Sequence, residues 1–342
     1  AKRKAPARRK ARPAARGANR RLALLAGLAL ASAVAAVVAV SALLPGEPDP
    51  SVPPVATETI PAPPPAAVAP ARPAAPPESA SPAVAPPSEV AAAPPRPLPP
   101  WRKNAVPADV RAGQPMIAIV IDDMGIDRAR SARTVALPAP LTLAYLAYAG
   151  DLEAQTAAAR TAGHELLVHV PMEPGTAATD PGPNALLTGL SDAELRRRIA
   201  WNLAQFDGYV GINNHMGSKA TGDTSLMAPV MDELARRGLL FLDSRTAAST
   251  VAERTARATG IPALRRDVFL DHDPSPIAVR AALLDLEKVA EQQGFAIAIG
   301  HPKDATIAAL AEWLPDVRSR GFAVVPVSAV ARWVTGESPA RM

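Results

Sequence analysis

The sequence predicts an α/β fold in which a parallel sheet, covered by helices on both faces, forms one closed or nearly closed barrel. From about Gln114 onward, short apolar runs alternate with helical patterns, and this order is typical of parallel sheets. Glycines follow several of the helical runs, as they do where helices end. The part of the chain with this pattern has about 220 residues, which is enough for a single barrel.

Eight apolar runs are the predicted strands: residues 116–121, 141–146, 165–170, 209–212, 239–242, 263–270, 295–299 and 322–327. Two capping boxes predict helix starts: Ser191 with Glu194, and Thr250 with Glu253. Four glycines predict helix ends: Gly238, Gly260, Gly294 and Gly321. Seven or eight strands therefore alternate with helices, and their carboxyl ends should form one rim, where such barrels carry their sites.

The positive charge of the chain is concentrated at its beginning. The net charge is +5, from 37 Lys and Arg against 32 Asp and Glu, but ten of the basic residues lie within residues 1–21. Without these ten, 27 basic residues are outnumbered by 32 acidic ones, so the folded part does not have the charge of a nucleic-acid-binding domain. The chain has no cysteine, which excludes disulfides, thiol nucleophiles and cysteine-ligated metals.

Residues 22–44 form a run of 23 apolar or small residues without a charge, which as a helix spans a hydrocarbon core of roughly 30 Å. The basic residues 1–21 precede this run, so the positive-inside rule predicts that they form a cytoplasmic tail. We therefore expect a single-pass inner-membrane protein whose folded domain lies in the periplasm. The alternative is a signal peptide cleaved near Ala39-Val40-Ser41, but the apolar core of a signal peptide is usually shorter.

Residues 45–113 are predicted to be a disordered linker rich in Pro and Ala. Residues 45–100 contain 21 prolines and have no apolar periodicity that could build a core. Proline-rich segments also bind partner proteins, but no short motif repeats here, so we expect a tether. The folded domain is predicted to span residues 114–334, with a tail at residues 335–342.

Polar residues collect at the ends of the predicted strands: Asp122 and Asp123; His169; Asn213, Asn214 and His215; Asp243 and Arg245; Asp271, His272 and Asp273; and His301. One polar residue after a strand is usually a cap or a turn former, but this many on one rim predict a functional site. Neutral imidazoles and carboxylates suit zinc or a similar divalent ion. Such an ion makes hydrolysis the expected chemistry.

The adjacent carboxylates of Asp122 and Asp123 suit two different roles. Neighbouring residues of an extended chain point in different directions, so one can ligate a cation while the other acts as a base. One alternative is that the pair caps the helix that begins near Asp127. Another is a phosphoryl-transfer site, which is disfavoured because the aspartates of acid-phosphatase-type sites are separated by one residue.

Six segments, in this order, resemble one known family: IAIVIDDMG, LLVHVPMEP, GINNHMGSK, FLDSRT, RRDVFLD and AIAIGHP. They are similar to motifs of the YibQ-like divergent polysaccharide deacetylases, a remote branch of the NodB-type carbohydrate deacetylases. The similarity covers residues from about 114 to 334. It implies a distorted, NodB-like (β/α) barrel of seven or eight strands that removes N- or O-acetyl groups from sugar polymers with the help of a metal ion.

The resemblance also implies roles for individual residues. Asp122 and Asp123 match the aspartate pair of the first motif, with Asp122 as the general base and Asp123 as a metal ligand. His169 matches the first histidine of the second motif and is a further ligand. His301 follows the last apolar strand and matches the acid that protonates the leaving group.

Two departures from the family motifs leave the third metal ligand open. Glu173 replaces the second histidine of the second motif, so either Glu173 or His215 completes the site, and we favour His215 because catalytic zinc prefers imidazole. The Arg-x-Pro-Tyr motif is missing, and Asn213, Asn214 and His215 stand in its place. Three more polar residues are expected around the site: Asp243 and Asp271, which orient histidines, and Arg245, which pairs with Asp243 or contacts substrate.

The sequence therefore predicts a metal-dependent hydrolase, with zinc as the expected ion, that removes acetyl groups from an envelope polysaccharide such as peptidoglycan. The alternative is a non-catalytic envelope protein that binds a glycan or a partner on the same barrel, and the missing motifs favour it. The retained aspartate pair and His301 favour the enzyme, because a binding surface needs neither a base nor an acid. His164 and His272 are expected to lie outside this chemistry.

Overall fold

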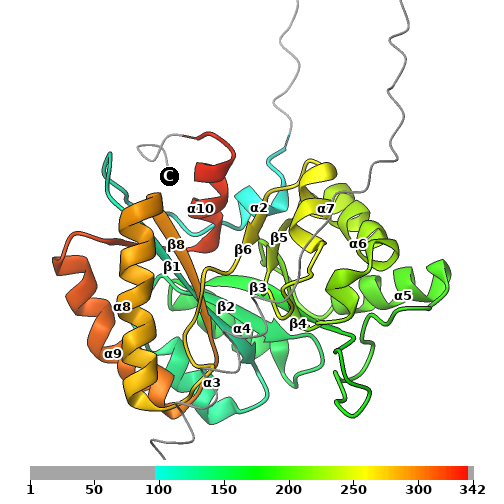
Figure 1. The fold of residues 1–342 in the computed structure, drawn as a ribbon, viewed down its shortest axis with the longest axis horizontal. Coiled ribbons are helices and arrows are strands. Elements are labelled where there is room, and N and C mark those ends of the chain that lie inside the picture. Colours follow the sequence, from blue (N-terminus) through cyan, green and yellow to red (C-terminus); the bar gives the residue numbers. More distant parts are fainter. Residues whose placement is uncertain (1–96, 338–342) are drawn as a thin grey trace, which may run out of the picture. The chain divides into compact units, whose positions relative to one another are not determined.

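Nine parallel strands form one sheet in residues 97–337, the part of the chain that the computed structural model describes (Figure 1). The strands are β1 (Met116–Met124), β2 (Thr142–Leu146), β3 (Glu165–Met172), β4 (Gly211–Met216), β5 (Leu240–Asp243), β6 (Ala263–Arg265), β7 (Val268–Phe269), β8 (Phe295–Gly300) and β9 (Ala323–Val325). Their order is β6-β5-β4-β3-β2-β1-β8-β7, and β9 pairs with the first residues of β1. The predicted parallel α/β fold is confirmed.

Helices connect the strands and cover the sheet. They are α2 (Pro100–Lys103), α3 (Arg128–Val135), α4 (Leu152–Thr161), α5 (Asp192–Asn202), α6 (Thr224–Arg237), α7 (Ala252–Ala258), α8 (Pro276–Gln293), α9 (Asp304–Ser319) and α10 (Val327–Val334), with a short 3₁₀ turn η1 (Ala220–Gly222). Figure 1 shows α8 beside α9 at one end of the sheet and α5 beside α6 near the other.

One of the two predicted capping boxes is confirmed as a helix start. The Ser191 hydroxyl accepts a hydrogen bond from the backbone N–H of Glu194 and caps α5. The predicted box at Thr250 is displaced by one residue. The N-cap of α7 is Val251, and the Thr250 hydroxyl accepts a hydrogen bond from the backbone N–H of Ala252, not from that of Glu253. The same hydroxyl donates to the Asp243 carboxylate, 2.7 Å away, which ties the start of α7 to the end of β5.

The sheet curves into a half-barrel that stays open between β6 and β7. The segment 263–270, predicted as one strand, is two short strands: β6 pairs with β5, and β7 pairs with β8. Among the described residues, no strand pairing joins β6 to β7. The chain therefore crosses the gap at Arg266 and Asp267. Of the two predicted forms, closed and nearly closed, the closed barrel is wrong.

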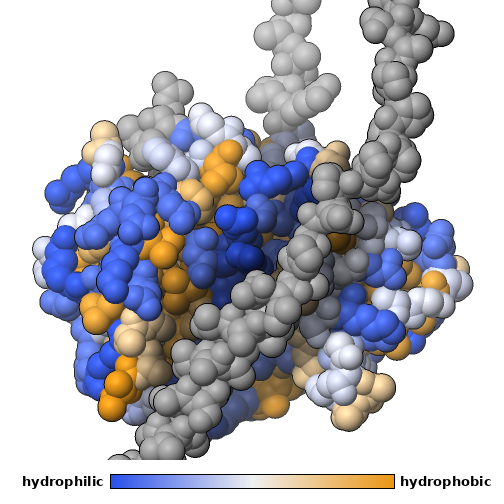
Figure 2. Space-filling model, in the orientation of Figure 1, coloured by the Kyte–Doolittle hydropathy of each residue, from blue (hydrophilic) through white to orange (hydrophobic). Residues whose placement is uncertain are grey.

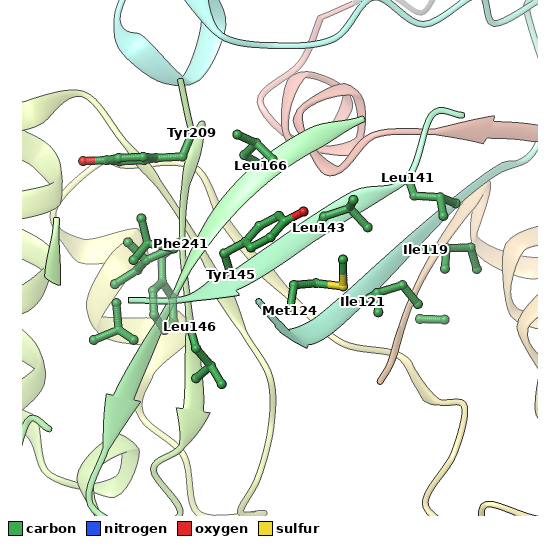
Figure 3. Packing of buried hydrophobic residues seen from close by; sticks show 14 of the residues in the cluster. Ile119, Ile121, Met124, Leu141, Leu143, Tyr145, Leu146, Leu166, Tyr209 and Phe241 are labelled. Carbon is green, nitrogen blue, oxygen red and sulfur yellow. The ribbon is translucent and has the colours of Figure 1, made fainter. Parts of the chain in front are cut away.

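The two faces of the sheet pack against different partners because side chains alternate along each strand. Ile117, Ile119 and Ile121 of β1 belong to a cluster completed by the surrounding helices. Figure 3 shows its members from β1, β2, β3 and β5 packed side by side. Ala118 and Val120 lie on the opposite face, here called the inner face. The inner cluster is completed by residues outside the sheet: Trp101, Val110, Val327, Ala329, Val330 and Ala331.

The folded domain begins earlier than residue 114, its predicted start. Trp101 is buried, and its backbone N–H donates to the carbonyl of Gly238. The Asn104 side chain donates to the carbonyl of Tyr209, at 2.8 Å. Proline content predicted a linker here, but prolines are also found where helices begin, as Pro99 (the N-cap) and Pro100 (the first helical residue) are at α2. The predicted tail 1–21, membrane helix 22–44 and linker up to residue 96 lie outside the described residues.

The outer surface of the described domain is mixed in polarity. Figure 2 shows hydrophilic and hydrophobic residues interspersed on the face that it draws, and α8 exposes Ile277 and Leu284. Scattered exposed apolar residues are usual for a folded domain. Within residues 97–337, none of the helices combines the length and the apolarity that a membrane span needs.

A buried carboxyl group connects three segments beneath the sheet. Glu165, at the start of β3, accepts hydrogen bonds from the backbone N–H groups of Val106 and Ser328 and from the hydroxyls of Thr142 and Ser328. Burial raises the pKa of Glu165 to about 7, although the hydrogen bonds from Ser328 oppose the shift. Glu165 therefore connects these segments on the inner face, at the start of β3, and its pKa lies near neutral pH.

We predict that Trp101→Ala lowers the free energy of unfolding by about 3 kcal/mol, because it leaves a large cavity in the inner cluster. Leu98→Ala, three residues away at an exposed position, should change it by less than about 0.5 kcal/mol. Chemical denaturation followed by fluorescence and circular dichroism measures both. Equal effects of the two substitutions would place Trp101 outside the core.

The raised pKa of Glu165 predicts that stability falls as pH rises. Between its ordinary pKa of 4.5 and about 7, the folded chain keeps a proton that the unfolded chain has lost. The free energy of unfolding should therefore drop by about 3 kcal/mol across this window and become level above it. Glu165→Gln should remove this component, whereas the exposed Glu312→Gln should not. Urea denaturation at several pH values tests this, and parallel profiles for wild type and Glu165→Gln would contradict it.

Candidate metal centre

The site begins with an irregularity at the end of β1. Asp122 shares the alternation of Ala118 and Val120 and so belongs to the inner face. Asp123 should face the other way, but its φ of 56° is left-handed, and the register of β1 against β2 shifts between Ile121 and Met124. Such a bulge re-aims a side chain. As a result, both adjacent carboxylates line the same cavity.

Strands β3 and β4 supply two imidazoles. His169 and Asn213 are paired positions of these strands, and His215 lies two residues further along β4 on the same face. His169 Nδ1 donates to Asn213 Oδ1 at 2.8 Å, which turns His169 Nε2 toward Asp123. The Asn213 amide also donates to Asp122 Oδ1 at 2.7 Å. Asn213 therefore orients one histidine and one aspartate at once.

Three potential ligand atoms converge at this point. Asp123 Oδ1 lies 2.9 Å from His215 Nδ1 and 3.3 Å from His169 Nε2, and the two imidazole nitrogens are 3.2 Å apart. Two ligands about 2.1 Å from a tetrahedral zinc ion lie about 3.4 Å from each other. Asp123 Oδ1 is also buried and accepts no hydrogen bond from the described residues. The donor set and its spacing fit a divalent cation such as zinc.

His301 faces the same cluster from β8. Its Nδ1 donates to Asp271 Oδ1 at 2.9 Å, and its Nε2 lies 3.8 Å from Asp123 Oδ2. Asp271 is fully buried and also accepts hydrogen bonds from the backbone N–H of His301 and from the Thr306 hydroxyl. This contact is the one that the predicted orienting role of Asp271 requires. The arrangement fixes the His301 tautomer and directs Nε2 into the cavity.

Burial and charge shift the pKa values of three of these groups. Burial raises the pKa of Asp122, against the attraction of His169 and His301. Burial also acts to raise the pKa of Asp123, but contacts with His169 and His215 outweigh it and hold this pKa well below its usual range. Burial lowers the pKa of His301, but the hydrogen bond to Asp271 and the neighbouring carboxylates raise it by more. The adjacent aspartates thus differ in basicity.

These residues line a cavity of about 510 Å³ at the carboxyl ends of the strands. Sequence reasoning missed several of its walls: Met216, Ser244, Thr246, Arg266, Phe269 and Ile299. Arg266 was not predicted as a site residue because it lies inside the segment 263–270, which was predicted as one strand. Two consecutive arginines, Arg265 and Arg266, in a supposedly buried strand were the signal that the strand breaks there.

Two expected site residues have other roles. Glu173 receives an ion pair from Lys219 and hydrogen bonds from Thr188, so it does not join the metal cluster, and His215 is the third candidate ligand. Asp243 contacts no histidine among the described residues. It shares the alternation of Phe241, which faces the helices, and its carboxylate binds Thr250 and the backbone N–H of Arg245.

The remaining predicted residues lie at the edges of the site. Asn214 accepts a hydrogen bond from the backbone N–H of Ser244 and donates to the carbonyl of Met216, and so connects the loops after β4 and β5. Arg245 lines the cavity. His272 is exposed at its rim, and His164 is buried at the opposite end of β3, where its ring bonds the backbone of Leu141 and Val135.

We predict that Asp123→Asn weakens zinc binding by more than the roughly 10- to 100-fold that loss of an outer hydrogen-bonding partner costs. Asn tolerates the left-handed backbone at this position, so the fold should persist while the anionic ligand is lost. Glu173→Gln is the matched control and should bind zinc like wild type. Competition with a chromophoric chelator measures both affinities, and equal losses in the two variants would restore Glu173 as a ligand.

Comparison with known proteins finds relatives of this chain. The chain is 35% identical over 230 residues to the uncharacterized protein YibQ of Escherichia coli (strain K12), covering 64% of this chain and 71% of YibQ. It is 37% identical over 199 residues to an uncharacterized protein of Haemophilus influenzae, covering 58% and 70% of the two chains. The crystal structure of the uncharacterized protein ATU2773 from Agrobacterium tumefaciens C58 is similar, with a TM-score of 0.66 and 33% identity, over 68% of this chain and 95% of that one.

The model of one protein family, described as divergent polysaccharide deacetylase, matches residues 119–331. This range contains the whole cluster from Asp122 to His301 and every strand of the sheet except the first residues of β1. The match extends over more than half of the chain. The chain belongs to the divergent polysaccharide deacetylase family.

Proposed function

We propose that the protein is a metal-dependent hydrolase that removes acetyl groups from a glycan of the cell envelope. One observation carries the proposal: a three-residue ligand cluster, a buried carboxylate and a carboxylate-bound histidine face one cavity. Family membership supports a polysaccharide as the substrate. Zinc is the proposed ion, because two imidazoles and one carboxylate are a common catalytic ligand set for it.

Asp123, His169 and His215 are the proposed ligands. A divalent cation held there supplies Lewis acidity, which polarises a carbonyl oxygen and lowers the pKa of a water molecule. The protein's part is to hold the three ligand atoms together before the substrate arrives. Asn213 does so for His169, and the bulge at the end of β1 does so for Asp123.

Asp122 is the proposed general base. It is buried beside the ligand cluster, and its Oδ2 lies 3.7 Å from His169 Nε2. The Asn213 amide holds its other oxygen. Burial raises its pKa, which makes the carboxylate a better proton acceptor than an exposed aspartate. It takes the proton of the water that attacks the acetyl carbonyl.

His301 is the proposed general acid. Its Nε2 faces the cluster while Asp271 accepts the hydrogen bond from Nδ1. A buried carboxylate at Nδ1 stabilises the protonated imidazole, as the raised pKa of His301 reflects. His301 can therefore donate its Nε2 proton to the leaving amine or alcohol of the sugar when the bond to the acetyl carbon breaks.

The cellular setting is part of the proposal. The apolar run at residues 22–44 and the basic residues before it support an inner-membrane anchor, with the domain carried into the periplasm on the proline-rich segment. In that compartment the available polysaccharides are those of the envelope, of which peptidoglycan is the proposed substrate class.

The test is acetate release from acetylated chitooligosaccharides and from acetylated peptidoglycan strands by the zinc-loaded protein. Asp122→Asn and His301→Gln should each lower the rate by about 10²- to 10⁴-fold, because each removes a proton-transfer group. Glu312→Gln is the control: this side chain lies on α9 in an exposed ion pair with Arg280, so the rate of this variant should stay within about twofold of wild type.

Removing zinc with a chelator should abolish turnover, and restoring zinc should recover it. A protein that binds these glycans but releases no acetate at any zinc concentration would be a non-catalytic binding protein, and the enzyme proposal would be rejected.

A further inference from the structure

Two arginines share the cavity with the proposed catalytic residues. Arg245 follows β5, and Arg266 lies in the gap between β6 and β7. Both line the same cavity as Asp122 and His301. Arg266 reaches the cavity from the gap at which the half-barrel is open, and its side chain contacts the backbone of Arg245.

Arg266 is held in one position by three contacts. Its Nε donates to the carbonyl of Ser244 at 2.8 Å, and its Nη2 donates to the carbonyl of Arg245 at 2.9 Å. Its guanidinium carbon lies 4.8 Å from the centre of the Phe269 ring, at stacking distance. Because Arg266 binds the backbone of residues 244 and 245, it also fixes the loop that carries Arg245.

Ion pairs within the described part of the chain do not balance the positive charges of these two groups. Among the described residues, no carboxylate forms a salt bridge with Arg245 or Arg266, and the Arg245 side chain forms no hydrogen bond. Burial lowers the pKa of Arg266, and the charge of Arg245 lowers it further; carboxylates at a longer distance act in the opposite direction: Asp122, Asp243 and Asp267. Two like charges held on one cavity wall favour an anion between or beside them.

We propose that Arg245 and Arg266 form a subsite for a carboxylate of the substrate, so that the preferred glycan contains an acidic sugar next to the acetylated one. This inference rests on the proposed function and narrows its substrate class. The donors of Arg245 are free to bind a planar carboxylate in the bidentate manner. Arg266 has given Nε and one Nη2 hydrogen to the backbone, so it contributes mainly charge and position.

The test measures by calorimetry how tightly oligosaccharide probes bind to the full, zinc-bound chain. The chain carries Asp122→Asn, so that it does not hydrolyse the probes. The carboxylate probe is a tetrasaccharide of alternating N-acetylglucosamine and N-acetylmuramic acid. The neutral probe is N-acetylated chitotetraose, and the third probe is chitotetraose carrying a phosphate ester. We expect the carboxylate probe to bind at least about tenfold more tightly than the neutral one, with the difference shrinking as ionic strength rises.

Arg245→Gln should abolish the preference, and Arg245→Lys should keep part of it, because lysine retains the charge without the bidentate fork. Arg280→Gln removes the same charge from an exposed ion pair on α8 and should leave the preference unchanged. Circular dichroism of each variant shows whether it is folded, and the lysine variant still tests the subsite if the glutamine variant does not fold.

Equal affinity of wild type for the carboxylate and neutral probes would overturn the inference, as would a preference that survives Arg245→Gln. Tighter binding of the phosphate probe than of the carboxylate probe would also overturn it. Acetate release by the unmutated protein separates the two proposals. If the protein releases acetate from neutral chitotetraose but binds the carboxylate probe no more tightly than the neutral one, only the subsite proposal is rejected. If it prefers the carboxylate probe, loses this preference in Arg245→Gln and releases acetate from none of the probes, only the enzyme proposal is rejected.

Discussion

The left-handed backbone at Asp123 is the constraint on which the site depends. In a regular strand, the side chains of Asp122 and Asp123 point to opposite faces. The bulge at the end of β1 brings both to the inner side, where one meets Asn213 and the other meets two imidazoles. A non-glycine residue in this conformation is strained. The strain is sustained because β1 is buried between β2 and β8 along its length.

A small number of supporting residues holds the cluster in place. A single side chain, Asn213, fixes the tautomer of His169 and the orientation of Asp122. Asp271 fixes the tautomer of His301. His169 and His301 thus each use one ring nitrogen for support and present the other to the cavity. These supporting residues lie on or directly after strands, and parallel strands in register hold them with little freedom.

The open side of the barrel decides the shape of the cavity. A strand running without interruption through residues 263–270 would place Arg266 in a sheet between neighbours. Because the chain instead crosses a gap there, Arg266 turns back to the carbonyl groups of Ser244 and Arg245 and becomes a wall of the cavity. The incomplete sheet therefore gives the cavity a wall that carries two arginines, Arg245 and Arg266.

The sequence by itself determined the parallel α/β fold, most strand positions and the polar rim that contains Asp122, Asp123, His169, His215 and His301. These are local features, because apolar runs and the polar residues that end them can be recognised within a few positions. The resemblance to family motifs added the expected division of roles between the two aspartates, which stays a prediction.

Only the tertiary structure decided where the domain begins, where the segment 263–270 breaks, and which residue joins Asp123 and His169. Trp101 is buried by residues far along the chain, and Glu173 is removed from the site by Thr188 and Lys219. Asp243 misses the cavity because its strand position faces the helices. Each of these outcomes depends on which face a side chain occupies and on what the opposite segment offers it. The face and the partners of a side chain both depend on contacts between distant segments, and these contacts cannot be recognised from residues close together in the sequence.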